Sequence, residues 1–229
     1  MAAAAKKTRK ELLKEPDEFI TLSSRLLGFI ATYQKTLAYV CIGALAVVAA
    51  FSGYVAYAGW QESKAAAELS QALAKYERLR AGGPPEKAVQ DVAADFRRIL
   101  SDYGSRTNGN IARVLFANLC YDAGDFKQAV ELYRTSLARF ADDPVMHFQL
   151  MRSMGYAHEG LKDYAGAVSY FEQALSAGQK NLQDDVLFHL GDLYARLGDP
   201  QKSSAAFNRL LTEHQDSIYV NMVRERVSG

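Results

Sequence analysis

Three stretches in the second half of the chain align without a gap: AGDFKQAVELYRTSL at Ala123–Leu137, LKDYAGAVSYFEQAL at Leu161–Leu175, and LGDPQKSSAAFNRLL at Leu197–Leu211. Each contains an aspartate followed by an aromatic residue or proline, then a small residue, an aromatic residue and a closing leucine. Aspartate is a favoured helix N-cap because its carboxylate accepts hydrogen bonds from the free N–H groups of the first turn. The pattern therefore predicts three similar helices that begin at Asp125, Asp163 and Asp199.

A second helix is expected upstream of each of these three, with a small residue where paired helices approach closely: Ala117, Gly155 and Gly191. The capping aspartates are 38 and then 36 residues apart. The helix pair and its spacing resemble the tetratricopeptide repeat (TPR), whose usual period is about 34 residues. The extra residues are expected in the turns around 142–144 and 178–180. The resemblance covers about Asn110 to Ser217 and implies an all-α solenoid of helical hairpins.

Helical patterns continue on both sides of the three repeats. Residues 61–80 and 86–103 are predicted to form two helices separated by the breaker AGGPP at 81–85. We interpret the region 59–109 as connecting helices that form a degenerate first repeat, and 110–217 as the three TPR repeats. Residues 218–229 are predicted to form a C-terminal capping helix with a polar outer face, as a solenoid end requires.

An uncharged apolar segment, LAYVCIGALAVVAAFSGYVAYA, runs from Leu37 to Ala58. At about 1.5 Å per residue, a helix of this length crosses a hydrocarbon core of about 30 Å. Aromatic residues stand near its two ends, as is usual at membrane interfaces: Tyr39, Tyr54, Tyr57 and Trp60. The predicted fold class is therefore all-α, with a single N-terminal transmembrane helix at 37–58 followed by a TPR-type helical-hairpin solenoid.

The basic residues near this segment lie mostly before it. Before the segment stand Lys6, Lys7, Arg9, Lys10, Lys14, Arg25 and Lys35, and in a comparable stretch after it stand Lys64 and Lys75. The positive-inside rule then predicts a cytoplasmic N-terminus and a repeat domain on the other side of the membrane. An alternative is cleavage by a signal peptidase after Ala56-Tyr57-Ala58, although the long charged leader favours an uncleaved anchor.

The leader, residues 1–36, carries an apolar stripe at helical spacing: Phe19, Leu22, Leu26, Phe29, Ile30 and Tyr33. This stripe predicts an amphipathic helix that lies on the cytoplasmic membrane surface or docks on another membrane protein. The first ten residues are expected to be disordered.

The chain offers little that points to catalysis or to nucleic acid. A formal net charge of +1 gives no field for a nucleic-acid partner. There is no phosphate-binding loop, dinucleotide fingerprint, HExxH or GxSxG motif, and the four histidines lack partners at metal-ligand spacing. Cys41 and Cys120 fall in different kinds of segment, so a disulfide is not expected. We predict no cofactor, no metal site and no enzymatic activity.

The concave wall of such a solenoid is formed by the first helix of each repeat. Transferring the groove-facing positions of TPR proteins gives twelve candidate partner-binding residues: Ile111, Val114, Asn118, Tyr121, Gln149, Arg152, Tyr156, Glu159, Asp185, Phe188, Asp192 and Arg196. This surface mixes aromatic, apolar and charged groups, which suits an extended or helical peptide. The Lys- and Asn-rich clamp by which some TPR proteins hold a chaperone's carboxyl terminus is matched only by Asn118.

The order of leader, single span and TPR domain is similar to the YfgM-like family of ancillary subunits of the bacterial SecYEG translocon. This resemblance implies a single-pass inner-membrane protein whose periplasmic TPR domain meets secreted clients, periplasmic chaperones or the Sec translocon. The leader is longer than expected for that family. The alternative is a TPR scaffold or assembly factor for a cell-envelope machine, such as a pilus, secretion or division apparatus.

Overall fold

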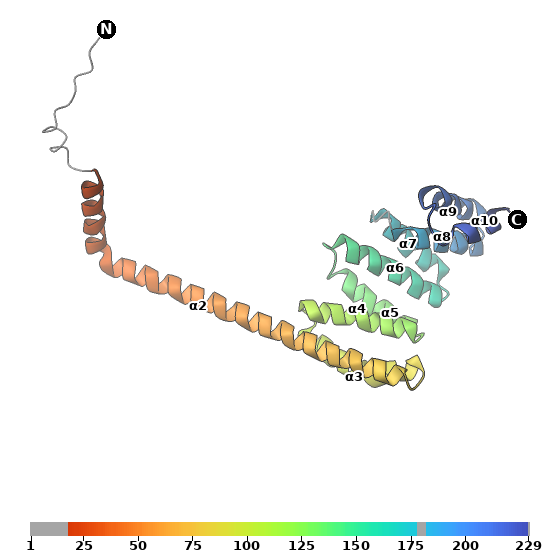
Figure 1. Cartoon of the computed structure of the whole chain (residues 1–229), viewed down its shortest axis with the longest axis horizontal. Helices are drawn as coiled ribbons and strands as arrows, with labels where there is room; N and C mark the ends of the chain where they lie inside the picture. The colour runs from red at the N-terminus through yellow and green to blue at the C-terminus, as the bar shows by residue number, and fades with distance from the viewer. Residues whose placement is uncertain (1–17, 178–181, 229) are drawn as a thin grey trace, which may run out of the picture. The chain divides into compact units, whose positions relative to one another are not determined.

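The chain is helical throughout the part that the computed structural model describes, residues 18–177 and 182–228, and no strand occurs there. The helices are shown in Figure 1. Their bounds are α2 Glu18–Arg80, α3 Pro85–Tyr103, α4 Thr107–Asp122, α5 Phe126–Leu137, α6 Pro144–Gly160, α7 Tyr164–Ser176, α8 Asp184–Arg196, α9 Pro200–Glu213 and α10 Val220–Ser228. The predicted fold class is confirmed. The expected turn around 178–180 and the first ten residues lie outside the described residues.

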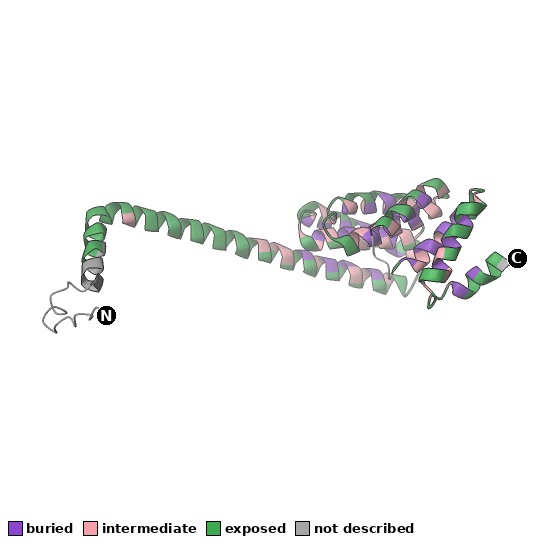
Figure 2. Cartoon of the chain, turned by 90° about the horizontal axis from the view of Figure 1, so that it is seen from above, coloured by how far each residue is buried: buried purple, intermediate pink, exposed green. Residues whose placement is uncertain are grey.

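The chain divides into two compact units, Met1–Gly59 and Trp60–Gly229, and α2 continues across the boundary. In the first unit, α2 is kinked at Tyr33, whose φ of −108° and ψ of 16° leave the helical region. The most apolar window of α2 has a mean hydropathy of 2.0, and none of it is buried within the chain. Figure 2 shows this stretch as exposed. By length and composition, α2 can therefore cross a membrane.

The kink separates the end of the leader from the apolar segment. Phe29, Ile30 and Tyr33 are exposed, and the rings of Phe29 and Tyr33 lie 4.9 Å apart. The side chains of the stripe's first three members, Phe19, Leu22 and Leu26, lie outside the described residues. Which surface the leader contacts therefore stays a prediction.

In the second unit, the last part of α2 packs beside α3. Ala65, Leu69, Ala72 and Tyr76 form its buried face, at the spacing of one helical stripe. Lys75 forms an ion pair with Asp95 of α3 at 2.8 Å. The carboxylate of Glu62 accepts hydrogen bonds from the backbone N–H groups of Thr107 and Asn108, at 2.8 and 3.0 Å, which binds α2 to the start of α4. Burial acts to raise the pKa of Glu62, but these hydrogen bonds bring it below its ordinary value.

The three predicted hairpins are present as α4/α5, α6/α7 and α8/α9. Their second helices begin as predicted: Asp125, Asp163 and Asp199 each accept a hydrogen bond from the backbone N–H three residues later, at 3.0 to 3.1 Å. The turn before each cap contains a left-handed residue, Gly124 at φ 77°, Lys162 at φ 62° and Gly198 at φ 78°. Lys162 therefore adopts the left-handed conformation at the position where the other two turns have glycine. This conformation costs free energy for a residue that has a Cβ atom.

The small residues of the first helices allow the close approach that the sequence predicts. A Cβ added at Gly155 would lie 2.6 Å from the Phe171 ring, and one added at Gly191 would lie 2.2 Å from the Phe207 ring. These contacts are shorter than real Cβ contacts, so glycine is required at both positions unless the ring moves. In the first hairpin, alanine suffices, and Ala117 and Tyr133 are both buried.

The core runs as a series of clusters along the stacked helices. The first cluster joins α2 to α6, the second joins α6 to α9, and the third joins α8, α9 and α10. Cys120 is fully buried in the first cluster, and this burial raises the pKa of its thiol to about 12. Cys41 lies exposed on α2, and both cysteines are free, as expected.

The last helix, α10, packs Val220 and Val223 against the third cluster. Its exposed residues are mostly polar: Asn221, Arg224, Glu225 and Arg226. The apolar residues Met222 and Val227 are also exposed, with exposed fractions of 42% and 48%. That this helix caps the solenoid stays a prediction.

Candidate partner-binding groove

The twelve predicted groove residues lie on α4, α6 and α8, the first helices of the three hairpins. None of them is buried: Ile111 and Arg196 are exposed, and the other ten are half-buried. Half-burial is what a wall residue needs, because its base packs on the core while its tip stays accessible to a partner. The described structure brings some of them into direct contact and leaves others apart.

One group of predicted groove residues is linked by direct hydrogen bonds. It joins α6 to α8 around the carboxylate of Asp185. Nη1 of Arg152 lies 2.9 Å from Oδ2 of Asp185, and the hydroxyl of Tyr156 donates a 2.6 Å hydrogen bond to the same oxygen. Burial first, and then the hydrogen bond to Asp185, raise the pKa of Tyr156, so it stays a neutral donor. Three predicted groove residues, two from α6 and one from α8, therefore form one half-buried polar cluster.

His189 extends this cluster and was not among the predicted groove residues. Its Nδ1 atom lies 2.9 Å from Oε2 of Glu159 on α6. Its ring lies 4.8 Å from the ring of Tyr156 in an edge-to-face arrangement, and 5.7 Å from Phe171. From the sequence, the four histidines are expected to be surface or packing residues and not metal ligands. Within the described residues, no group of three or more His, Cys, Asp and Glu side chains could hold a metal ion.

The end of the wall at α8 is covered by the chain itself. The Tyr219 ring stacks on Phe188 with centroids 4.5 Å apart, and the Arg226 guanidinium lies 5.2 Å from the centre of the same ring. Arg226 also forms an ion pair with Asp192. Phe188 and Asp192 were expected on an open groove, but α10 and the turn before it pack there as the first helix of another repeat would.

The wall at α4 has a different character. Ile111 is exposed, Val114 packs partly on the first core cluster, and Asn118 accepts a 2.6 Å hydrogen bond from the Tyr133 hydroxyl of its own hairpin. Tyr121 packs edge-on against Phe126 at 5.3 Å. Burial and then the negative charge of Glu159 on α6 raise the pKa of Tyr121.

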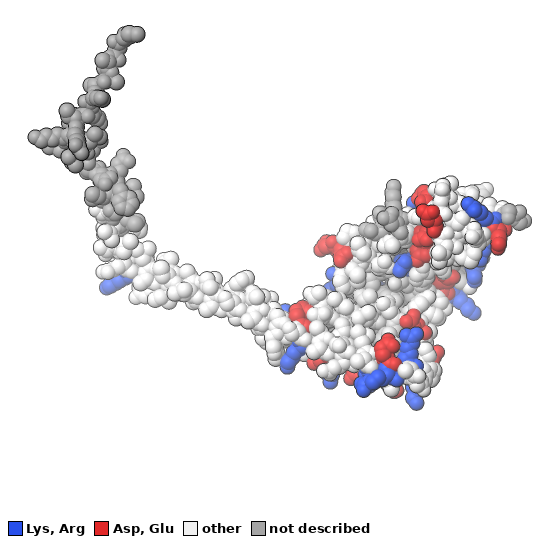
Figure 3. Space-filling model, in the orientation of Figure 1, with Lys and Arg blue, Asp and Glu red and all other residues white. Residues whose placement is uncertain are grey.

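The remaining two predicted residues stand apart from the polar cluster. The Arg196 guanidinium lies 5.6 Å from the Tyr164 ring, at the start of α7. Gln149 is half-buried on the first turns of α6. Figure 3 shows both signs of charge scattered over the visible face of the repeats, and the apolar part of α2 without charge. No large field of one sign marks the visible surface, which favours contact-based recognition.

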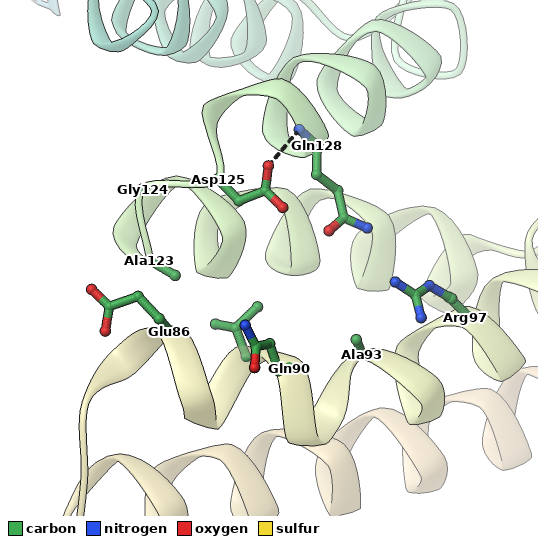
Figure 4. A pocket seen from close by; sticks show the side chains of 9 residues that line it. Glu86, Gln90, Ala93, Arg97, Ala123, Gly124, Asp125 and Gln128 are labelled. Atoms are coloured by element: carbon green, nitrogen blue, oxygen red, sulfur yellow. Dashed lines mark hydrogen bonds between the residues drawn. The ribbon is translucent and has the colours of Figure 1, made fainter.

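A separate pocket of about 600 Å³ lies between α3 and the turn that joins α4 to α5. Figure 4 shows Glu86 and Arg97 towards opposite ends, with Gln90 and Gln128 between them. None of the twelve predicted residues lines it. We favour the concave wall as the site because its side chains are half-buried and held by neighbouring helices, whereas Glu86, Gln90 and Arg97 are exposed side chains of one helix.

The repeat geometry agrees with the family that the chain matches. No curated protein matches the chain. Among solved structures, the chain is similar to BtubC from P. vanneervenii, with 17% identity over 70% of this chain and 74% of that one and a TM-score of 0.48. It is also similar to MamA from Desulfovibrio magneticus RS-1, with 14% identity over 66% of this chain and 97% of that one and a TM-score of 0.47. The family described as tetratricopeptide repeat-like domain matches residues 29–227, so the chain belongs to this family.

Proposed function

We propose that this chain is a membrane-anchored TPR protein that binds segments of other proteins along its concave wall. The observation that carries the proposal is the cluster of Arg152, Tyr156 and Asp185 beside the Glu159–His189 pair. These contacts hold the polar side chains of two helices in place before a partner arrives, which reduces the ordering cost of binding. The apolar and aromatic groups of α4 then supply accessible contact area.

The apolar segment of α2 is the proposed anchor. Its length, its hydropathy and its lack of burial within the chain support a single span. The excess of Lys and Arg before the span supports a cytoplasmic N-terminus, with the TPR repeats in the periplasm. Because the family match starts at residue 29, it includes the apolar segment as well as the repeats.

Within this frame, we favour an ancillary or chaperone-linked role at the Sec translocon of a bacterial inner membrane. The support is the similarity of the layout to YfgM-like proteins: a cytoplasmic leader, one span and a compact TPR domain. Such a domain would meet secreted chains or periplasmic chaperones as the chains emerge. The mixed wall suits varied, partly apolar segments better than a single charged motif.

Photocrosslinking in cells tests this role. A photoreactive amino acid placed at Gln149, on the wall, should crosslink to translocon subunits, secreted chains or periplasmic chaperones, identified by mass spectrometry. The matched control places the same group at Gln90, which is exposed on α3 away from the wall. Crosslinks from Gln149 to pilus, secretion-apparatus or division proteins would replace the Sec role with the scaffold role. Equal crosslinks from both positions would overturn the groove itself.

A further inference from the structure

Arg113, on α4, is a buried cation without a carboxylate partner. Its exposed fraction is 8%. Nη1 donates a 2.8 Å hydrogen bond to Oδ1 of Asn110, and Nη2 donates a 3.2 Å hydrogen bond to the carbonyl of Gly104. Both acceptors are uncharged. Among the described residues, no Asp or Glu forms an ion pair with Arg113, and none acts on its pKa.

The surroundings of Arg113 do not balance its charge. A buried charge without a counter-charge is costly, because it loses its hydration. Gly104 is the C-cap of α3, and the end of a helix carries only about half an elementary negative charge. Burial, and then the positive charge of Arg139, lower the pKa of Arg113. The site is therefore expected to take up an anion that the described residues do not supply.

The groups around this position are hydrogen-bond donors that suit an oxyanion. A guanidinium has five N–H groups, and the two hydrogen bonds of Arg113 use only part of them. Arg139, just after α5, is exposed, and Asn110 is half-buried, so the group reaches the surface of the repeats. The carbonyl oxygen of Asn110 faces Arg113, and its NH2 group is a further donor. Two arginines and one amide match the several oxygens of a phosphate group.

We propose that Arg113 and Arg139, together with the side-chain amide of Asn110, bind a phosphate group. The bond to phosphate would give the buried guanidinium the counter-charge that it lacks. The site is separate from the concave wall, because none of these three residues is among the twelve wall positions.

The position of the site in the chain indicates where the phosphate comes from. Glu62 accepts hydrogen bonds from the first backbone N–H groups of α4, the helix that carries Arg113. Glu62 follows the apolar segment 37–58 by four residues, which is about 6 Å of helix. The headgroup layer extends about 5 to 7 Å beyond the hydrocarbon core. If the proposed anchor is correct, a phospholipid headgroup is the expected source, and free phosphate is the other.

Thermal unfolding of the full-length protein in an uncharged detergent tests the site, because an anion that binds only the folded chain raises the melting temperature. The first arm compares inorganic phosphate with chloride at equal ionic strength. The second arm compares micelles that contain phosphatidylglycerol with micelles that contain the same fraction of diacylglycerol, which has no phosphate. We expect a rise of about 3 °C at ten times the dissociation constant. A rise in the first arm alone would identify free phosphate as the ligand, and a rise in the second arm identifies the headgroup.

Substitutions show whether the rise comes from this site. Arg139→Gln removes an exposed charged donor and should raise the dissociation constant for phosphate about tenfold. Arg134→Gln, on the same side of the sequence in α5, is the matched control and should leave it unchanged, because Arg134 pairs with Glu131. Arg113→Gln should abolish binding but also loses the hydrogen bond to Gly104, so Arg139→Gln decides if Arg113→Gln does not fold.

Two results would overturn the proposal. One is the absence of a rise with either anion. The other is a rise of equal size in Arg139→Gln, because phosphate would then act on the whole surface or the lipid on the span. The phosphate arm needs no membrane, and neither arm involves the crosslinks from Gln149, so this site and the proposed function fail separately.

Discussion

The first hairpin, α4/α5, and the two hairpins that follow build the same shape with different contacts. Across α6, α8 and α10, polar side chains join neighbouring wall helices through the Asp185 cluster, the Glu159–His189 pair and the Arg226–Asp192 ion pair. Between α4 and α6, no hydrogen bond or ion pair joins wall side chains among the described residues. Asn118 instead bonds to Tyr133 of its own hairpin.

The hairpins also differ from one another in the core and in the turns. The first hairpin uses Ala117 where the later two use Gly155 and Gly191 against a phenyl ring. The middle hairpin alone places a non-glycine residue, Lys162, in the left-handed turn position. The wall therefore has two parts. Polar pairs join the helices of its C-terminal part, whereas its N-terminal part presents the exposed Ile111 and the half-buried Val114 and Tyr121.

The largest effect is expected from Phe171→Ala. Phe171 is fully buried, lies against Gly155 and contacts the rings of Tyr156 and His189, so its loss opens a cavity under the fixed part of the wall. The free energy of unfolding should fall by about 3 to 5 kcal/mol. Urea unfolding of the solubilised chain, followed by circular dichroism, measures this. A loss below about 1 kcal/mol, within the range of surface substitutions, would contradict the packing.

Exchanging the small residues at the helix crossings tests how the first hairpin differs from the later two. Gly155→Ala should lower the free energy of unfolding by about 2 kcal/mol, because the new methyl group would collide with the Phe171 ring. In the first hairpin the opposite change, Ala117→Gly, should cost about 1 kcal/mol through helix propensity. The same urea titration compares the two. Stabilisation by Gly155→Ala would show that the ring has room to move.

Substitutions in the two parts of the wall should affect folding stability and partner binding differently. Asp185→Ala removes the shared acceptor of Arg152 and Tyr156 and should cost about 1.5 kcal/mol of folding free energy. The aligned change in the first hairpin, Ile111→Ala, should leave the unfolding free energy within about 0.5 kcal/mol, because Ile111 is exposed. It should nevertheless reduce the groove crosslinks obtained from Gln149. Unchanged crosslinking in Ile111→Ala would remove α4 from the binding surface.

The smallest effect concerns the turn of the middle hairpin. Lys162→Gly should stabilise the fold by about 1 kcal/mol, because glycine adopts a positive φ without the steric cost that lysine bears. Lys162→Ala keeps a Cβ in the same conformation and is the neutral control. Thermal unfolding of both variants measures the difference. A destabilised Lys162→Gly would mean that the entropy of the unfolded chain outweighs the strain.

Much of the fold follows from local rules that act within one repeat. An aspartate at a helix start caps the first turn with its own side chain, and a small residue at the crossing point lets the partner helix of the same hairpin approach closely. For that reason the aspartate caps and the Gly155–Phe171 and Gly191–Phe207 contacts could be predicted from the aligned copies. The kink at Tyr33 and the Glu62 bonds to α4 could not, since neither has a repeated counterpart.

The candidate site could be predicted only as a set of wall positions. Their exposure follows from helical periodicity, but the pairing of side chains depends on how neighbouring repeats are rotated against each other. His189 lies one position after Phe188 and reaches Glu159 only because α6 and α8 pack at this offset. Likewise, the covering of Phe188 by Tyr219 depends on where the chain turns after α9. The sequence signal for His189 is its place directly after the aligned wall position Phe188.

The buried thiol of Cys120 gives the first hairpin, α4/α5, a property that the other two hairpins lack. A thiol must be both accessible and ionised to react, and here burial withholds it from solvent and raises its pKa to about 12. Alkylation of Cys120 therefore requires the helices around it to separate. In a Cys41→Ser chain, the rate at which an alkylating reagent modifies Cys120 would measure how often the first hairpin opens in living cells.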